Sequence, residues 1–287
     1  MSRLLRITAL TGALFCFAVF VRADSPEISI EQLIKALDDE NLRRGASIAL
    51  AKRKKQVVPA LRKSLASNHR NRRVWAAFTL GEIGPAANSA VEDLTHSLEH
   101  EDDALRAATA QAIGKIGPAA RSSVRALADS LGDENADVRR KSIAALGRVG
   151  PLAGKAAPEL INSLKDAEVR QAAKDALIQI GEPAVAALRE ALNDDALRFD
   201  VREILRQIDP GQPGAGQPVL ADLASLRAAL HDLTRSPRER AAAAAELASL
   251  DKPGVAVLIE AFEKEVIASA ASKAFATVGP SALDALI

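Results

Sequence analysis

The sequence has few of the side chains that build a bulky core or a reactive thiol site. Of its 287 residues 3% are aromatic, tyrosine is absent, and there is one tryptophan and one cysteine. Cys16 lies in an apolar N-terminal run, so the chain after that run has no thiol. Disulfides, zinc–thiolate sites and cysteine nucleophiles are therefore excluded there. Alanine and leucine dominate, which suits thin helices at close range and argues against a globular enzyme core.

Acidic residues are missing from one stretch. Between Arg43 and Arg73 there are eleven lysines and arginines and no aspartate or glutamate. This basic end could bind a polyanion, such as a glycan, lipid phosphates or an acidic protein, with strong salt dependence. The alternatives are a solvated face on a terminal unit and pairing with the acidic end of another copy.

The first 23 residues have the pattern of an export signal. Arg3 and Arg6 precede an apolar run from Ile7 to Val21, and Ala23 is a small residue at the position that a signal peptidase reads. We predict a signal peptide over residues 1–23 with cleavage after Ala23, and hence a periplasmic or extracellular protein. The run is shorter than the ~20 apolar residues of a membrane span, so we expect no stable span after cleavage, and a retained anchor is the alternative.

After the N-terminal run, the chain repeats itself. The segments RVWAAFTLGEIGP, RAATAQAIGKIGP and RRKSIAALGRVGP share a spacing of 33 residues, which is seen at Arg73, Arg106 and Arg139 and again at Gly84, Gly117 and Gly150. A period of this length is typical of stacked supersecondary units. The sequence therefore predicts a solenoid.

Within one repeat, the apolar spacing predicts two helices. Residues from Arg106 to Gly117 carry apolar side chains at helical steps, and the glycine can adopt the positive φ that closes a helix. Pro118 is tolerated in the first turn of a second helix, whose apolar stripe reaches Leu131. We call these the first and second helices of a repeat. Neither can bury its apolar face alone, so each pair must pack on the next.

The same frame recurs and gives about eight repeats. Further first helices are predicted to open at Arg43, Arg170, Arg198, Arg240 and Ala268. The Pro- and Gly-rich segment 209–218 breaks any helix, so we predict one array over 24–208, a linker over 209–218 and a shorter array over 219–287. A single apolar stripe precedes each array, at Ile30, Leu33 and Leu37 and at Leu223, Leu226 and Leu230.

The chain ends on the apolar sequence ALDALI. The end of a solenoid is expected to be polar. We therefore expect this end to pack on another subunit, on the first array, or on sequence that a truncated gene product lacks.

The repeated residues resemble the HEAT family, and within it the short bacterial type named after the phycobilisome lyases. The likeness is carried by the turns from Leu80 to Pro85 and from Leu146 to Pro151, by Val138-Arg139 and Val169-Arg170, and by Ala157-Pro158-Glu159-Leu160. This resemblance implies an all-α superhelix of helical hairpins. It also implies a ladder of arginines and turn acids between neighbouring repeats, for which Asp137, Arg139, Glu168 and Arg170 match.

HEAT-like arrays mostly serve as binding scaffolds, so the resemblance implies a non-catalytic protein that binds another protein and carries no cofactor. His100-Glu101 has the spelling of the iron ligands of HEAT-like hydroxylases, but one pair cannot build a di-iron site. No nucleic acid partner is expected, although some HEAT-like proteins excise DNA bases on a cationic concave face. An accessory subunit of an enzyme complex, such as a lyase or an oxidoreductase, is a further alternative.

Two groups of residues are candidates for partner contacts. We expect the second helices to line the concave face and to present Glu92, His96, Arg125, Asp129, Glu159 and Asn162. The basic end offers Arg53, Lys54, Lys55 and Arg72. Beside it, Trp75 and Phe78 are predicted to point away from the core of their own repeat, where they would anchor a partner or fill a groove against Ile48 of the first repeat.

Overall fold

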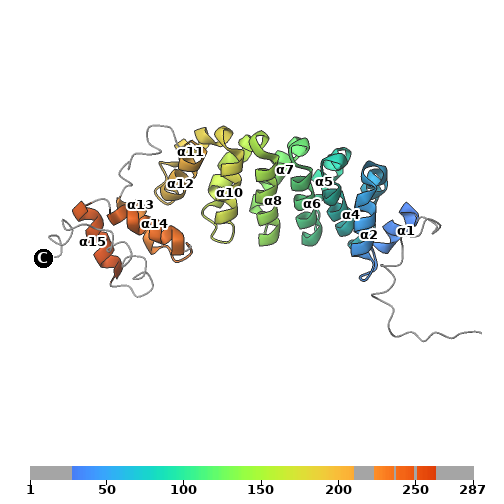
Figure 1. Cartoon of the computed structure of the whole chain (residues 1–287), viewed down its shortest axis with the longest axis horizontal. Coiled ribbons are helices and arrows are strands. Elements are labelled where there is room, and N and C mark those ends of the chain that lie inside the picture. Colours follow the sequence, from blue (N-terminus) through green and yellow to red (C-terminus); the bar gives the residue numbers. More distant parts are fainter. Residues whose placement is uncertain (1–27, 210–222, 236, 249–250, 263–287) are drawn as a thin grey trace, which may run out of the picture.

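The structure is a computed structural model that describes residues 28–209, 223–235, 237–248 and 251–262. All regular secondary structure in these residues is helical, and the predicted all-α solenoid is confirmed. The helices stand side by side in one arched row (Figure 1). The predicted signal peptide, residues 210–218 of the predicted linker, the repeat that opens at Ala268 and the ALDALI end lie outside the described residues.

Hairpins of a first and a second helix follow one another along the row. The first helices are α2 (Arg43–Lys52), α4 (Arg70–Ile83), α6 (Asp103–Ile116), α8 (Ala136–Val149), α10 (Arg170–Ile180) and α12 (Arg198–Ile208). The second helices are α3 (Val58–Leu65), α5 (Val91–Ser97), α7 (Val124–Asp129), α9 (Ala157–Ser163) and α11 (Val185–Ala191). Helix α1 (Ile30–Ala36) precedes them, and α13 (Leu223–His231), α14 (Pro237–Ala248) and α15 (Asp251–Phe262) follow.

Glycines end the first helices as predicted. Gly84, Gly117, Gly150 and Gly181 have φ between 68° and 72°, a region that side chains with a Cβ rarely adopt. The start of the second helix was predicted wrongly. A 3₁₀ helix begins at the glycine itself and runs over Gly117–Ser123. Helix α7 begins only at Val124, because Ala120 leaves the helical region with φ −95° and ψ 23°. In the first repeat Lys54 takes the place of the glycine, with φ 48°.

Successive first helices touch almost backbone to backbone. A Cβ added to Gly81 or to Gly114 would lie 2.8 Å from the Cα of Ala112 or of Ala145, respectively, in the next first helix. Successive second helices are in much looser contact. In an arched row the closely spaced layer is the inner one.

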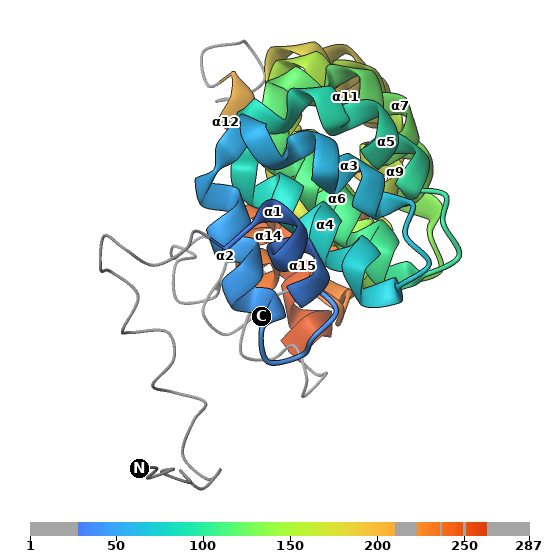
Figure 2. The ribbon, with the colours of Figure 1, turned by 90° about the vertical axis from the view of Figure 1, so that its right-hand side faces the viewer.

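The first helices therefore form the concave face, and the expectation that the second helices line it is wrong. Both ends of the row bend toward the side of the first helices (Figure 1). Figure 2, viewed along the row, shows α3, α5, α7 and α9 together on the opposite side from α2 and α4. The six candidate contact residues of the second helices therefore lie on the convex face, and their predicted place on the concave face is wrong.

The predicted ladder between repeats is present, with a different set of acids. Arg106 donates two hydrogen bonds to the Asp133 carboxylate of the next repeat, at 2.7 and 2.9 Å. Arg139 bonds Asp166 at 3.1 Å and Glu168 at 2.8 Å in the following one. Asp137 is not part of the ladder.

Asp137 instead pairs within its own helix, with Lys141 at 2.8 Å and Arg140 at 3.6 Å. The hydrogen-bond partners of Arg170 also differ from the predicted turn acid. Its Nε donates to the Leu164 carbonyl, and its Nη1 donates to Thr234, at 2.8 Å in each case. The ladder thus extends from α10 to the residues between α13 and α14.

The ladder makes stability sensitive to acid. Burial raises the pKa of Asp133, but the hydrogen bonds from Arg106 and from the Asn135 amide, together with the positive charges of Arg106 and Arg139, outweigh it and hold this pKa below the ordinary 3.8. A lowered pKa contributes stability that is present above pH 3.8 and is lost as the pH falls through the folded-state pKa. We expect Asp133→Asn to lower the free energy of unfolding by about 2 kcal/mol at pH 7.

Urea titrations at pH 7 and pH 3 measure this effect. The difference between the wild type and Asp133→Asn should shrink at pH 3, because the wild-type carboxyl is then largely protonated in the unfolded chain. Asp137→Asn is the matched control, since Asp137 is half-exposed and pairs only within its helix. An equal loss of stability for both variants at pH 7 would contradict the role given to Asp133.

Buried charges join the helices that follow the linker to the first array. Lys174 of α10 and Arg235, just before α14, are 2% and 6% exposed, and Asp200 of α12 is fully buried. Arg235 donates two hydrogen bonds to the Asp200 carboxylate, at 2.6 and 2.8 Å. The Lys174 ammonium lies 3.4 Å from Asp200 and 2.8 Å from Glu239 of α14, and it also bonds Glu203. We call these five residues the charged junction.

Candidate functional site

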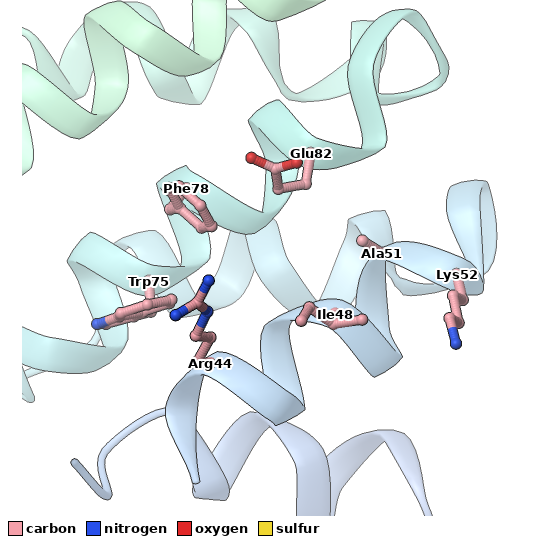
Figure 3. Close-up of a pocket in the computed structure, with 7 residues that line it drawn as sticks. All are labelled: Arg44, Ile48, Ala51, Lys52, Trp75, Phe78 and Glu82. Atoms are coloured by element: carbon pink, nitrogen blue, oxygen red, sulfur yellow. The ribbon is translucent and has the colours of Figure 1, made fainter. Parts of the chain in front are cut away.

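An open groove of about 710 Å³ lies on the concave face between α2 and α4. Its lining residues are Arg44, Ile48, Ala51 and Lys52 of α2 and Trp75, Phe78 and Glu82 of α4 (Figure 3). The sequence explains this arrangement, because Arg44, Ile48 and Lys52 follow at steps of four and so share one face of α2. We call this site the α2–α4 groove.

An aromatic ridge forms the α4 wall of the groove. Trp75 and Phe78 are three residues apart, so they are neighbours on the helix surface. Their ring centroids are 5.2 Å apart in an edge-to-face arrangement. The Arg43 guanidinium lies 5.5 Å from the centre of the Trp75 ring, and the Lys115 ammonium lies 5.3 Å from that of Phe78. Both rings are partly buried, and Trp75 also packs against the core, but each keeps some exposed surface, so the ridge offers apolar surface next to positive charge.

The opposite wall carries cations and one exposed apolar side chain. Ile48 is 51% exposed and lies between Arg44 and Lys52 on α2 (Figure 3). Among the described residues, no carboxylate lies within ion-pair distance of Arg44 or Lys52. The one acid of the groove, Glu82, already pairs with Lys115. The groove therefore combines apolar side chains on both walls with positive charge that has no acidic partner among the described residues.

The aromatic residues distinguish this part of the concave face from the rest. At the positions that correspond to Trp75 in the next three repeats, the first helices carry Ala108, Lys141 and Ala172. At the positions that correspond to Phe78, they carry Gln111, Ala144 and Asp175. Of the two predicted uses of the aromatic pair, anchoring a partner and filling a groove against Ile48, the structure shows both rings in a groove with Ile48 that remains open.

Some cations of the basic end are held by partners within the chain, and others stay exposed. Four of them pair with acids outside the stretch: Arg43 with Glu40, Arg62 with Asp93, Arg70 with Asp102, and Arg72 with Asp38. Arg53 donates to the Ile28 carbonyl at 2.7 Å. Of the predicted contact residues, Lys54 and Lys55 stay exposed, whereas the ion pair with Asp38 holds Arg72 in place.

The predicted contact residues of the second helices do not come together at one site. Glu92 and His96 lie on α5, Arg125 and Asp129 on α7, and Glu159 and Asn162 on α9, all on the outer row. Arg125 bonds Asp129 at 3.1 Å within its own helix. Their role in binding stays a prediction.

The one carboxylate cluster among the described residues is filled by a lysine. Asp200, Glu203 and Glu239 bring their oxygens within 4.8 Å of one another, but the Lys174 ammonium bonds all three. His100 directs its Nδ1 to the Asp102 amide, from which it accepts a hydrogen bond of 2.9 Å. Within the described ranges, no helix has the length and apolarity to cross a bilayer.

The fold defines a class of protein. No strand occurs in the described ranges, and stacked helical hairpins share one continuous core from α1 to α12. The sequence profile of HEAT repeats matches residues 30–114, 58–147, 91–167 and 124–207, which together span more than half of the chain. The chain belongs to the HEAT repeat family. Proteins of this family are typically protein-binding scaffolds and are generally non-catalytic.

One solved structure supports the fold, and a second is reported for its similarity alone. Kap95p, in the structure that describes its binding to RanGDP, is similar over 90% of this chain and 40% of its own, with 15% identity and a TM-score of 0.61. The complex of CpcE and CpcF of phycocyanin lyase from Nostoc sp. PCC7120 aligns over 88% of this chain and 98% of the matched chain, with 22% identity and a TM-score of 0.45. No curated protein matches this chain in sequence. The finer assignment to the phycobilisome-lyase type stays a prediction.

Proposed function

We propose that this HEAT repeat protein is an exported, non-catalytic scaffold that binds another protein on the concave face of its first helices. The observation that supports this proposal is the partly exposed aromatic ridge of Trp75 and Phe78 in the α2–α4 groove. Large aromatic side chains next to arginine are the residues that most often anchor protein interfaces. A small-molecule site would need a more enclosed apolar cleft with converging polar groups.

Affinity capture from the exported fraction tests the scaffold role. We expect a stoichiometric protein partner with the wild type and its loss with the double variant Trp75→Ala/Phe78→Ala. The matched control is Leu152→Ala, because Leu152 is 51% exposed outside the groove. Equal recovery with the aromatic variant would contradict binding at this groove. Capture at low and at high salt separates apolar from electrostatic recognition.

Export is tested separately. We expect the protein in the periplasmic or extracellular fraction, with a mature N-terminus at Asp24 after cleavage following Ala23. Cell fractionation and N-terminal sequencing measure both points. An intact N-terminus in the cytoplasmic fraction would contradict export and would leave the binding proposal to its own test.

Polyanion binding by the basic end is a second candidate, supported by the exposed Lys54 and Lys55. We expect the quadruple variant with Lys52, Arg53, Lys54 and Lys55 changed to glutamate to leave a heparin column at much lower salt than the wild type. The control reverses four cations elsewhere: Arg121, Arg125, Arg140 and Lys155. Equal retention of both quadruple variants would eliminate a specific role of the basic end.

A further inference from the structure

We infer that the α2–α4 groove binds an extended, acidic segment of a partner protein, in which one apolar residue lies midway between two acidic residues. This inference rests on the proposed function and adds the chemistry of the ligand. Three features of the groove carry it: the order of side chains along α2, the charge of the site, and the distance between its two helices.

The order of side chains along α2 determines the order along the ligand. Arg44, Ile48 and Lys52 follow one another on one face, with the apolar residue in the middle (Figure 3). At a rise of 1.5 Å per residue, Arg44 and Lys52 are about 12 Å apart along the helix axis. In an extended chain, residues i and i+4 are about 13 Å apart and face the same side as residue i+2. An acid, an apolar residue and an acid at i, i+2 and i+4 therefore match the three positions.

The charge of the groove favours an acidic ligand. Arg44 and Lys52 are exposed, and among the residues that the structure describes no acid pairs with either. Glu82 is engaged by Lys115, whose ammonium also lies 5.3 Å from the Phe78 ring centre. A carboxylate of the ligand would meet a cation at each end of the groove, and its apolar side chain would contact Ile48 on one wall and the aromatic ridge on the other.

The distance between the walls favours an extended segment over a helix. Packed helices such as α2 and α4 lie about 8–10 Å apart, whereas a helix with its side chains is about 10–12 Å wide. A helical ligand would thus bridge the two helices from above. An extended strand is narrow enough to seat its central side chain between Ile48 and Phe78. The exposed aromatic faces also permit stacking of nucleic acid bases, so single-stranded DNA is included as a competitor in the test.

The chain contains its own reporter for the test, because Trp75 is its only tryptophan. The full-length mature protein is titrated with the peptide Gly-Ser-Glu-Ser-Leu-Ser-Glu-Ser-Gly while Trp75 emission is followed. We expect saturable binding that weakens about tenfold or more when the central leucine becomes serine or when both glutamates become glutamine. A peptide with the glutamates next to each other should also bind less well, since it cannot reach both cations.

Protein variants locate the binding site. Arg44→Glu/Lys52→Glu should weaken binding about tenfold or more, whereas Lys55→Glu/Lys63→Glu makes the same charge change in the basic end outside the groove and should have little effect. Phe78→Ala should weaken binding and retains the Trp75 reporter. Circular dichroism of each variant shows whether it is folded. Equal weakening by the two double variants would overturn the inference.

The remaining outcomes separate this inference from the proposed function. A partner captured through Trp75 and Phe78, together with no response to the peptide, would refute the acidic ligand and leave the scaffold role intact. If the double variant Trp75→Ala/Phe78→Ala still captures the partner and Phe78→Ala, which keeps the Trp75 reporter, still binds the peptide as the wild type does, both proposals are refuted. A response of Trp75 to single-stranded DNA at lower concentration than to the peptide would overturn the choice of a protein ligand.

Discussion

Replacement of Lys174 by methionine is expected to lower the free energy of unfolding by about 3–5 kcal/mol, because it removes one of the two cations of the charged junction and leaves an excess of buried negative charge there. Lys174 is 2% exposed, and its ammonium contacts Asp200, Glu203 and Glu239. The methionine side chain is apolar and about as long as that of lysine, so the change removes the charge with little change in volume. Urea unfolding followed by circular dichroism measures the loss.

A surface lysine provides the control for this variant. Lys165 pairs with Asp194 at 2.9 Å, and both side chains are substantially exposed. We expect Lys165→Met to change stability by about 1 kcal/mol or less. The reasoning about Lys174 would be wrong if both variants lost the same small amount.

The charge of Lys174 also sets the pH range in which the junction is stable. Burial lowers the pKa of Lys174, but the hydrogen bonds to Glu203 and Glu239 outweigh it and hold this pKa above 10.5. A raised pKa contributes stability that is fully present below pH 10.5 and is lost as the pH rises through the folded-state pKa. Lys174 is therefore charged at neutral pH, and its part in the junction fails only in strong alkali.

The second large effect is expected at Gly114, where we predict that Gly114→Val destabilises the fold by about 3 kcal/mol. Glycine in the middle of a helix normally costs about 1 kcal/mol relative to alanine, so a substitution would ordinarily help. Here a Cβ would lie 2.8 Å from the Cα of Ala145 and 3.0 Å from its Cβ. The neighbour is backbone and cannot rotate away, so α6 and α8 must separate.

The control for Gly114→Val is Gly132→Val, because a Cβ at Gly132 meets nothing within 4 Å. We expect this variant to stay within about 0.5 kcal/mol of the wild type in thermal or urea unfolding. A stabilised Gly114→Val would contradict the close approach of the first helices.

Most of the fold could be predicted from the 33-residue period and from the glycines that close four of the six first helices. Which layer of helices forms the concave face could not be predicted from the apolar stripes. A stripe shows that a helix is buried, but it does not show which layer is more tightly spaced. A signal was available in the interior glycines Gly81, Gly114 and Gly147, which are tolerated in mid-helix where a neighbour comes close.

The candidate site was predictable in part. Trp75 and Phe78 depart from the repeat pattern and can be singled out, whereas Arg44 and Lys52 look like any other cation of the basic end until ion pairs with acids from outside the stretch remove several of the others. The charged junction was missed because Lys174, Asp200 and Arg235 belong to three different helical units, and periodicity within one helix carries no information on such contacts.

The backbone contacts between first helices have a mechanical consequence. Close-packed interiors resist compression, so tighter curling of the arch is opposed at every glycine contact on its inner side. Flattening of the arch only separates these contacts and meets looser packing on the outer side. The array therefore resists a decrease in its radius of curvature more than an increase. We expect it to open around a large partner more readily than it closes around a narrow one.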